Sequence, residues 1–388
     1  MKELSRITER FTESVIREMT RISDSLGGYN LSQGFPDFDS PIEIKEAAIN
    51  AISNNFNQYP ITFGEQELRE AISIKAAWYN NISCNPETDI TVTCGATEAM
   101  IATLKAIINP GDEIIIFEPF YENYGPDVIL SGATPRYISL QSENWDYNSD
   151  ELKDTFNNKT KAIIINTPNN PTGKVYTEKE LLEIADLCIK WDVIAITDEI
   201  YEHILYDNSK HISIASLPGM SERTITINSI SKTYSVTGWR VGWAIASPSI
   251  TSRIRKIHDF LTVGAPTPFQ HAAVKAINFP RHYYVSLRDR YSQARDLLFG
   301  ALEGAGFKPF LPQGAYYIIA DYSDIKSYIL SENDFDFSKK LLFKTGIASV
   351  PGSSFYSSNK TTNQIRFAFC KKRETLEIAK KNLLKISD

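Results

Sequence analysis

Lys232 and Arg240 are the residues whose types and spacing most directly suggest chemistry. They stand eight positions apart in 228–240, a segment rich in small hydroxyl residues. A lysine amine becomes a nucleophile at neutral pH when burial or a nearby positive charge lowers its pKa. Arg240 could supply that charge, and its planar guanidinium could hold a phosphate. The pair therefore suits a phosphorylated aldehyde, although two solvated charges on a strand or loop would give the same pattern.

The segment 94–99 follows an apolar run and begins with small residues. Gly95 allows a tight turn there, and a helix that starts with Ala96 and Thr97 would expose backbone N–H groups able to bind an anion. An ordinary strand-to-helix turn with Thr97 as its cap would explain the same residues. The segment is therefore a candidate phosphate site only in combination with others.

Two more junctions carry polar side chains. The loop 166–173 contains asparagines that can donate to a ligand oxygen, Asn170 among them, and prolines that fix its backbone. Such residues are also common in plain turns. Asp198 and Tyr201 place a carboxylate and a phenol three residues apart. Asp198 could pair with a positively charged ring nitrogen, or it could cap the next helix.

The elements that must position these residues alternate between helices and strands from Ser40 onward. This alternation predicts an α/β protein with a mostly parallel central sheet covered by helices. Capping-box patterns at 40–43 and 177–180 indicate two helix starts. Short apolar runs bounded by turn residues predict buried strands at 90–93, 113–117, 162–165, 193–197, 224–228 and 241–245. Because ligands bind beyond the carboxyl ends of parallel strands, we expect the polar junctions to share one edge.

The pattern changes after Pro280, where a long helix and later strands at 316–320 and 365–369 are expected. We therefore predict a large cofactor-binding domain at 41–280. Residues 1–40 and 281–388 would form an N-terminal arm and a smaller α+β domain, since a chain of 388 residues exceeds one ordinary core.

Composition and charge argue against a nucleic-acid-binding, membrane-spanning or metal-binding protein. The net charge of -6 gives no field that would attract nucleic acid, and no apolar run is long enough to cross a bilayer. The N-terminus lacks the apolar stretch of a secretory signal, so we expect a cytoplasmic protein. The four cysteines and five histidines show neither Cys-x-x-Cys nor His-Glu-x-x-His spacing, which predicts no disulfide framework and no metal site. Basic residues at 371–385 indicate a solvated helix face.

An amine, an acid, amide and phenol donors and an anion-binding turn at one sheet edge are what pyridoxal phosphate requires. Lys232 would form an imine with the cofactor aldehyde, and Asp198 would keep the pyridine nitrogen protonated. Asn170 and Tyr201 would donate to the ring oxygen. The phosphate would be held by the turn at Gly95 and Ala96 and by the side chains of Thr97, Ser229 and Arg240.

These motifs together resemble the class I/II pyridoxal-phosphate-dependent aminotransferases of fold type I, from 30–37 to 364–367. The resemblance implies that Lys232 also shuttles the proton between the substrate α-carbon and the cofactor. It implies that Tyr121 stacks on the cofactor ring. It further implies that Tyr59 reaches the phosphate of a neighbouring subunit, and hence a homodimer.

Arg366 matches the arginine that binds the substrate carboxylate in this family, with Gly34 and Asn170 completing the clamp. By itself, an arginine on an apolar strand would more often be a paired structural residue. Position 366 also lies beyond the predicted domain boundary, so substrate binding could draw the small domain closed.

The opening at 33–36 looks like the kynurenine, glutamine and methionine aminotransferase branch. We therefore expect amino-group transfer from an aromatic or sulfur-containing L-amino acid to a 2-oxo acid, by a ping-pong mechanism. The alternatives are an aspartate-type aminotransferase, β-elimination from cysteine conjugates at the same imine, and a non-catalytic binding module. The segment 259–271 lacks the arginine or lysine of dicarboxylate-specific relatives, which leaves Arg17 as an open candidate for a substrate contact.

Overall fold

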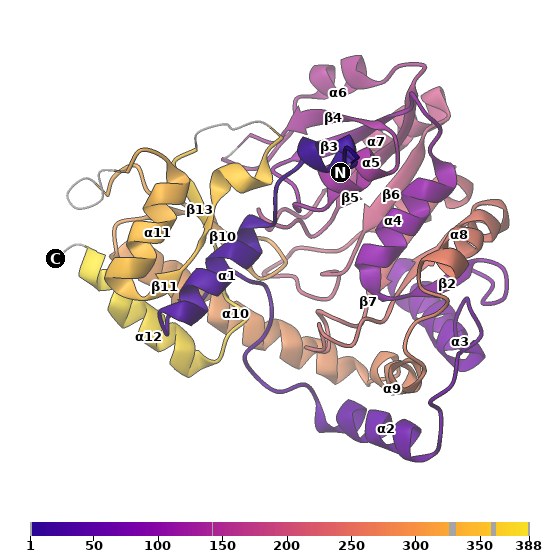
Figure 1. The fold of residues 1–388 in the computed structure, drawn as a ribbon, viewed down its shortest axis with the longest axis horizontal. Helices are drawn as coiled ribbons and strands as arrows, with labels where there is room; N and C mark the ends of the chain where they lie inside the picture. Colours follow the sequence, from indigo (N-terminus) through magenta and orange to yellow (C-terminus); the bar gives the residue numbers. More distant parts are fainter. Residues whose placement is uncertain (1, 142, 326–330, 358–361, 387–388) are drawn as a thin grey trace.

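A seven-stranded sheet, covered on both faces by helices, forms the centre of the chain (Figure 1). The computed structural model describes residues 2–141, 143–325, 331–357 and 362–386. The sheet order is β2 (Ile90–Thr93), β8 (Gly242–Ile245), β7 (Thr224–Ser229), β6 (Ile194–Asp198), β5 (Thr160–Asn166), β3 (Glu113–Glu118) and β4 (Thr134–Ser139). Six of these strands run in one direction, and β8 runs in the opposite direction between β2 and β7. The mostly parallel α/β fold is confirmed, with all six predicted strands present.

The two faces of the sheet bury alternate residues of each strand, as the two-residue period of a strand requires. Ile115 and Ile163 pack on the face covered by α6 and α7, whereas Ile114 and Ile164 pack on the face covered by α4, α5 and α8. These helices and their neighbours are α2 (Ile42–Ser53), α3 (Gln66–Lys75), α4 (Gly95–Ile107), α5 (Tyr124–Leu130), α6 (Ser149–Thr155), α7 (Glu178–Trp191), α8 (Pro248–Leu261) and α9 (Thr267–Ile277).

The two predicted helix starts differ in outcome. Thr177 caps α7 with the full reciprocal capping box to Glu180, as expected. The box predicted at Ser40 is wrong, because Pro41 is the cap residue of α2 and no side chain caps that helix. The extended backbone of Pro41, with ψ of 137°, places Ser40 one residue too early for its hydroxyl to reach the first free N–H groups.

The C-terminal part builds a second, antiparallel sheet in the order β12 (Val350–Pro351), β13 (Gln364–Ala368), β10 (Tyr317–Asp321) and β9 (Lys308–Pro309). Figure 1 shows the long α10 (Arg281–Gly304) extending from this group toward α9. The remaining helices here are α11 (Asp334–Thr345) and α12 (Arg373–Leu383).

The N-terminal residues pack against this second group. α1 (Val15–Ser25) lies beside it, and β1 (Tyr29–Asn30) pairs in parallel with β11 (Ile347–Ala348). This packing agrees with the expected association of the first forty residues with the C-terminal part. The division into two domains at residue 280 remains a prediction.

Two further sequence expectations concern helices. None of the described helices combines the length and apolar character needed to cross a membrane. The solvated basic face holds for much of α12, but it is wrong for Lys371, which precedes the helix and is buried. Its ammonium donates to the carbonyl of Phe35 at 2.9 Å, and this hydrogen bond links the N-terminal segment to the C-terminal part.

Candidate active site

Two adjoining cavities open where the strands of the central sheet end. The inner cavity, of about 120 Å³, is lined by Asn166, Asp198 and Ser229, which are the last residues of β5, β6 and β7. The outer cavity, of about 690 Å³, extends toward α1 and the C-terminal sheet. Lys232 and Asn170 line both cavities. The structure thus brings the predicted junctions together at one edge of the sheet.

Lys232 lies between the two cavities and is partly buried. Its ammonium donates to the carbonyl of Gly34 at 3.1 Å, across 198 residues of sequence. Burial lowers the pKa of Lys232 to about 8, and the positive charges of Arg240 and Arg366 act in the same direction. An amine with this pKa is unprotonated in a useful fraction near neutral pH, as a nucleophile requires.

Asp198 is the buried acid of the inner cavity. Burial raises the pKa of its carboxyl to about 6, while a hydrogen bond from the Tyr124 hydroxyl, at 2.6 Å, opposes that rise. Its other oxygen accepts from the backbone of Ile200, and no regular helix follows for it to cap. Such an acid would become fully ionised beside a protonated ring nitrogen.

The loop after β5 is fixed by its asparagines. The Asn166 side chain accepts from the backbone N–H of Asn170 at 2.7 Å and donates to the carbonyl of Asp198 at 3.0 Å. The Asn170 oxygen accepts from Arg366 at 2.7 Å, which leaves its amide NH₂ free to donate elsewhere. Tyr201 is buried in the same cavity.

The start of α4 forms an anion cradle with Arg240. A Cβ atom built on Gly95 would lie 2.1 Å from the Arg240 guanidinium, so only glycine lets the arginine approach this helix start. Cys94 caps α4 without a side-chain bond, and the alternative of a Thr97 cap is not what the structure has. Ala96 and Thr97 line the inner cavity beside Arg240.

Ser229 and Ser231 face this cradle from the segment before Lys232. The Ser229 hydroxyl accepts from the backbone of Ser231 at 3.2 Å. The Ser231 hydroxyl is buried and has no hydrogen-bond partner among the described residues. A buried hydroxyl without a partner is costly, so a ligand oxygen at this position would satisfy it.

Arg366 is buried at the wall of the outer cavity, with 1% of its surface exposed. Its guanidinium donates to Asn170 and to the carbonyl of Ser32, and it lies over the Tyr317 ring at 4.2 Å. Its Nε has no partner among the described residues. A buried cation with a free donor beside a cavity is suited to bind a carboxylate.

Of the remaining predicted site residues, Gly34 and Tyr121 lie at the two cavities and Tyr59 does not. Gly34 is required beside Arg366, because a Cβ atom there would lie 1.9 Å from the Tyr317 hydroxyl. Tyr121 lines both cavities. Tyr59 lines neither of the two cavities and is 85% exposed in this single chain.

The residues present fit pyridoxal phosphate. The inner cavity offers an amine with a lowered pKa, a buried carboxyl, an arginine at a helix start and a buried hydroxyl without a partner. An aldehyde, a pyridine nitrogen and a phosphate are the groups that would satisfy these four features.

Sequence reasoning missed several residues of this site. Tyr124 stands three residues after Tyr121, and only the fold brings its hydroxyl to Asp198. Tyr317 comes from the second sheet, and its hydroxyl lies 3.0 Å from that of Tyr201. Ser231 could have been found, because it sits one position before the lysine in the same hydroxyl-rich segment.

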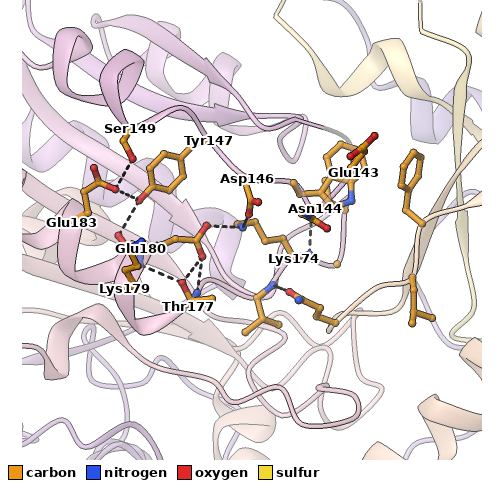
Figure 2. Close-up of a pocket in the computed structure, with 17 residues that line it drawn as sticks. Glu143, Asn144, Asp146, Tyr147, Ser149, Lys174, Thr177, Lys179, Glu180 and Glu183 are labelled. Atoms are coloured by element: carbon orange, nitrogen blue, oxygen red, sulfur yellow. Dashed lines mark hydrogen bonds and ion pairs between the residues drawn. The ribbon is translucent and has the colours of Figure 1, made fainter.

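A third cavity, of about 500 Å³, lies away from the sheet edge, beside the start of α7 (Figure 2). Four of the charged side chains that line it are paired within the protein, namely Lys174, Asp146, Glu180 and Glu183. The Lys174 ammonium lies 2.7 Å from Glu180 and 3.3 Å from Asp146, and Glu183 accepts from Tyr147. The cavity adjoins the loop that carries Asn170, so these pairs fix that loop.

Glu199, Glu202 and His211 form a compact group of possible metal ligands. The carboxylate oxygens of Glu199 and Glu202 accept from protein donors, and Glu202 forms an ion pair with Lys75. His211 Nε2 lies 2.9 Å from Glu199, whereas its Nδ1 is buried without a hydrogen-bond partner among the described residues. A lysine ammonium at this position already supplies the positive charge that a cation would bring. The absence of a metal from the reaction remains a prediction.

Comparison with known proteins agrees with this geometry. Residues 27–383 match the family model of aminotransferase class I and II. The chain is 39% identical to human kynurenine–oxoglutarate transaminase 3, over 96% of this chain and 87% of the relative. It superimposes on the N-succinyldiaminopimelate aminotransferase of Mycobacterium tuberculosis with a TM-score of 0.94 and 34% identity, over 99% and 100% of the two chains. It also superimposes on a methionine aminotransferase of Escherichia coli with a TM-score of 0.93 and 33% identity, over 99% of each. The chain therefore belongs to the class I and II aminotransferases, which depend on pyridoxal phosphate and transfer an amino group to a 2-oxo acid.

Proposed function

We propose that Lys232, Asp198 and the cradle of α4 and Arg240 hold the cofactor, and that the outer cavity binds the amino acid. Bound pyridoxal phosphate supplies an aldehyde that condenses with amines and a ring that accepts electrons from the substrate α-carbon. The observation that carries the proposal is the convergence of a low-pKa amine, a buried acid and an anion cradle in one cavity. Each group matches one functional part of the cofactor.

Lys232 has two tasks in this proposal. Its amine holds the cofactor in the resting enzyme, and it moves the proton from the substrate α-carbon once the substrate takes its place. A pKa of about 8 allows the same nitrogen to accept and return a proton near neutral pH. The carbonyl of Gly34, 3.1 Å away, holds the released amine in the cavity.

The other inner residues orient and polarise the cofactor. Asp198 keeps the ring nitrogen protonated, and Tyr124 holds that carboxylate in place. Asn170 and Tyr201 would donate to the ring oxygen, and Tyr121 would stack on the ring. The residues of the cradle would bind the phosphate, namely Gly95, Ala96, Thr97, Ser229, Ser231 and Arg240.

Arg366 binds the α-carboxylate of the substrate through the donor that has no protein partner. Asn170 fixes the guanidinium of Arg366 from one side. Gly34 carries no side chain, so the substrate carboxylate can approach this guanidinium. Because Arg366 belongs to β13 and Lys232 to the central sheet's edge, the substrate bridges the two sheets.

For the donor we propose an aromatic or sulfur-containing amino acid. The outer cavity presents Phe35, Tyr121, Leu261 and Tyr317, which suit an apolar side chain. The kynurenine–oxoglutarate transaminase and the methionine aminotransferase named above support the same class of donor. The placement of the enzyme in the cytoplasm remains a prediction from its sequence.

A panel of amino acids tests this function directly. The purified, cofactor-loaded protein is mixed with each amino acid, and the loss of its visible absorption is followed as the pyridoxamine form appears. We expect methionine, phenylalanine and kynurenine to react faster than aspartate. Faster turnover of aspartate would contradict the proposed donor class, and release of pyruvate and ammonia from a cysteine conjugate would indicate β-elimination instead.

We also propose a homodimer in which Tyr59 reaches the phosphate in the partner's site. Tyr59 is exposed in this single chain, and so are its sequence neighbours Phe56 and Ile61. Phe260 and Val263, at the end of α8 and just after it, are exposed as well. Such exposure is unusual for a chain that stays monomeric.

Mixed dimers test the shared site. Lys232→Ala and Tyr59→Phe proteins, each impaired alone, are unfolded together, refolded and assayed. In a mixed dimer one site has both native residues, so we expect activity to exceed the sum of the two parents. Activity that never exceeds that sum would place Tyr59 outside the partner's site.

A further inference from the structure

Helix α1 is fixed over the outer cavity by its first residues. The Ser14 hydroxyl accepts from the backbone N–H of Arg17 at 3.3 Å, which caps the helix, and it donates to the Glu122 carboxylate. Ile16 is buried against Val350 and Phe355. This anchoring on both sides sets the rotation of α1 about its axis, and Arg17 then lines the outer cavity.

The Arg17 guanidinium has no ion pair or hydrogen bond to any residue that the structure describes. Arg21, one turn further along the same helix, contrasts with it, because Arg21 pairs with Glu13 at 2.8 Å. The positive charge of Arg17 acts on Tyr121, the aromatic ring beside both cavities, and lowers its pKa against a larger rise caused by burial. Arg17 is therefore a free cation close to the place of the substrate.

The other charges that line the outer cavity are committed to protein partners or to roles already assigned. Glu98 accepts from His258 at 2.7 Å, and Glu122 accepts from Ser14. Arg240 belongs to the phosphate cradle, and Arg366 binds the α-carboxylate. Arg17 is left as the cation available to the distal end of a substrate.

We propose that Arg17 binds the distal carboxylate of a dicarboxylic 2-oxo acid, such as 2-oxoglutarate, that accepts the amino group. This inference rests on the proposed function, because it requires Arg366 to hold the α-carboxylate of the same molecule. A guanidinium presents two parallel N–H groups to a carboxylate and is suited to this task.

The exposure of Arg17 explains how one cavity serves two kinds of side chain. Arg17 is exposed to solvent, so its charge stays hydrated when an apolar donor side chain occupies the cavity. A buried, unpaired arginine would instead penalise such a donor heavily. When a dicarboxylic acceptor enters, Arg17 pairs with its distal carboxylate and offsets the repulsion from Glu122.

The test compares Arg17→Met with Arg21→Met, a control on the same helix that removes a paired and exposed arginine. Steady-state kinetics are measured with 2-oxoglutarate and with pyruvate as acceptor. For Arg17→Met we expect KM for 2-oxoglutarate to rise at least fivefold and KM for pyruvate to change less than twofold, with Arg17→Lys between the wild type and Arg17→Met. For Arg21→Met we expect neither value to change twofold.

A binding measurement removes the dependence on turnover. Glutarate and pentanoate have equal carbon chains, and neither can accept an amino group. Titration calorimetry of the holoenzyme should show glutarate affinity falling at least fivefold in Arg17→Met while pentanoate affinity stays unchanged.

Equal changes for the dicarboxylate and the monocarboxylate, or no change for either, would overturn the role of Arg17. Wild-type protein that transfers an amino group to no 2-oxo acid would overturn the proposed function instead, and the glutarate titration would still report on Arg17.

Discussion

Asp127 is a buried carboxyl at the wall of the inner cavity, and its titration should make the protein less stable as pH rises. It belongs to α5, it is 8% exposed, and one of its oxygens is buried with no hydrogen-bond partner among the described residues. Burial raises the pKa of Asp127 from 3.8 to about 7. The substitution Asp127→Asn keeps the shape of the side chain and removes its ionisation.

The sign follows from proton binding. Between pH 4 and pH 7 the folded protein keeps the proton on Asp127, whereas the unfolded chain loses it, so stability falls as pH rises through this window. A rise of about three pKa units, at about 1.4 kcal/mol per unit, makes ionised Asp127 cost roughly 4 kcal/mol. About 3 kcal/mol of this cost should develop between pH 5 and pH 8.5.

Urea unfolding followed by circular dichroism measures this effect. The wild type, Asp127→Asn and the exposed control Asp186→Asn are compared at pH 5 and pH 8.5 with saturating cofactor. Any pH-independent cost of burying the asparagine amide cancels in the difference between the two pH values. We expect the stability of Asp127→Asn relative to the wild type to rise by about 3 kcal/mol from pH 5 to pH 8.5. A difference that does not change with pH, or an equal change in Asp186→Asn, would refute the reasoning.

Three further substitutions give separate expectations. Arg366→Lys should lower kcat/KM for the amino donor by about 10- to 100-fold, because a lysine cannot reproduce the fork, while cofactor affinity measured by fluorescence stays unchanged. Tyr124→Phe removes the hydrogen bond that favours ionised Asp198, so the pKa of that carboxyl should rise further above its ordinary value and the acidic limb of the kcat profile should move to higher pH; an unmoved limb would contradict this. Gly34→Ala should lower kcat/KM by at least about tenfold, because its Cβ would lie 1.9 Å from the Tyr317 hydroxyl. A variant with native kinetics would contradict this expectation and show that Tyr317 can move to make room for the added methyl group.

The buried strands of the central sheet were predictable because both of their faces are covered. Runs such as 162–165 are apolar throughout, and the structure buries every residue of that run. β4 was missed for the opposite reason. It is an edge strand that carries Pro135 and Arg136 and exposes part of one face, so its sequence lacks both a continuous apolar run and a clean alternation.

Some residues of the candidate site were also predictable from local sequence patterns, whereas others were not. Lys232, Asp198 and the turn at Gly95 lie within a few residues of the ends of predicted strands, so the rule that ligands bind at the carboxyl ends of parallel strands predicts one shared edge for them. Lys232, Asp198 and Ala96 line the inner cavity at that edge, and their role in binding a cofactor stays a prediction. Tyr317 and Arg17 lie on the second sheet and on α1, and their approach to this edge depends on how the parts of the chain pack together. Local sequence patterns carry little information about such packing, and for Arg17 the sequence left its role open.

The proposed function requires that pyridoxal phosphate be covalently attached to Lys232, and chemical trapping detects this bond. The cofactor-loaded protein is treated with borohydride, digested and mapped by mass spectrometry. We expect a stable pyridoxyl group on the peptide that contains Lys232 and its loss in Lys232→Ala. A trapped group on another lysine, or no trapped group in yellow, cofactor-loaded protein, would contradict the account.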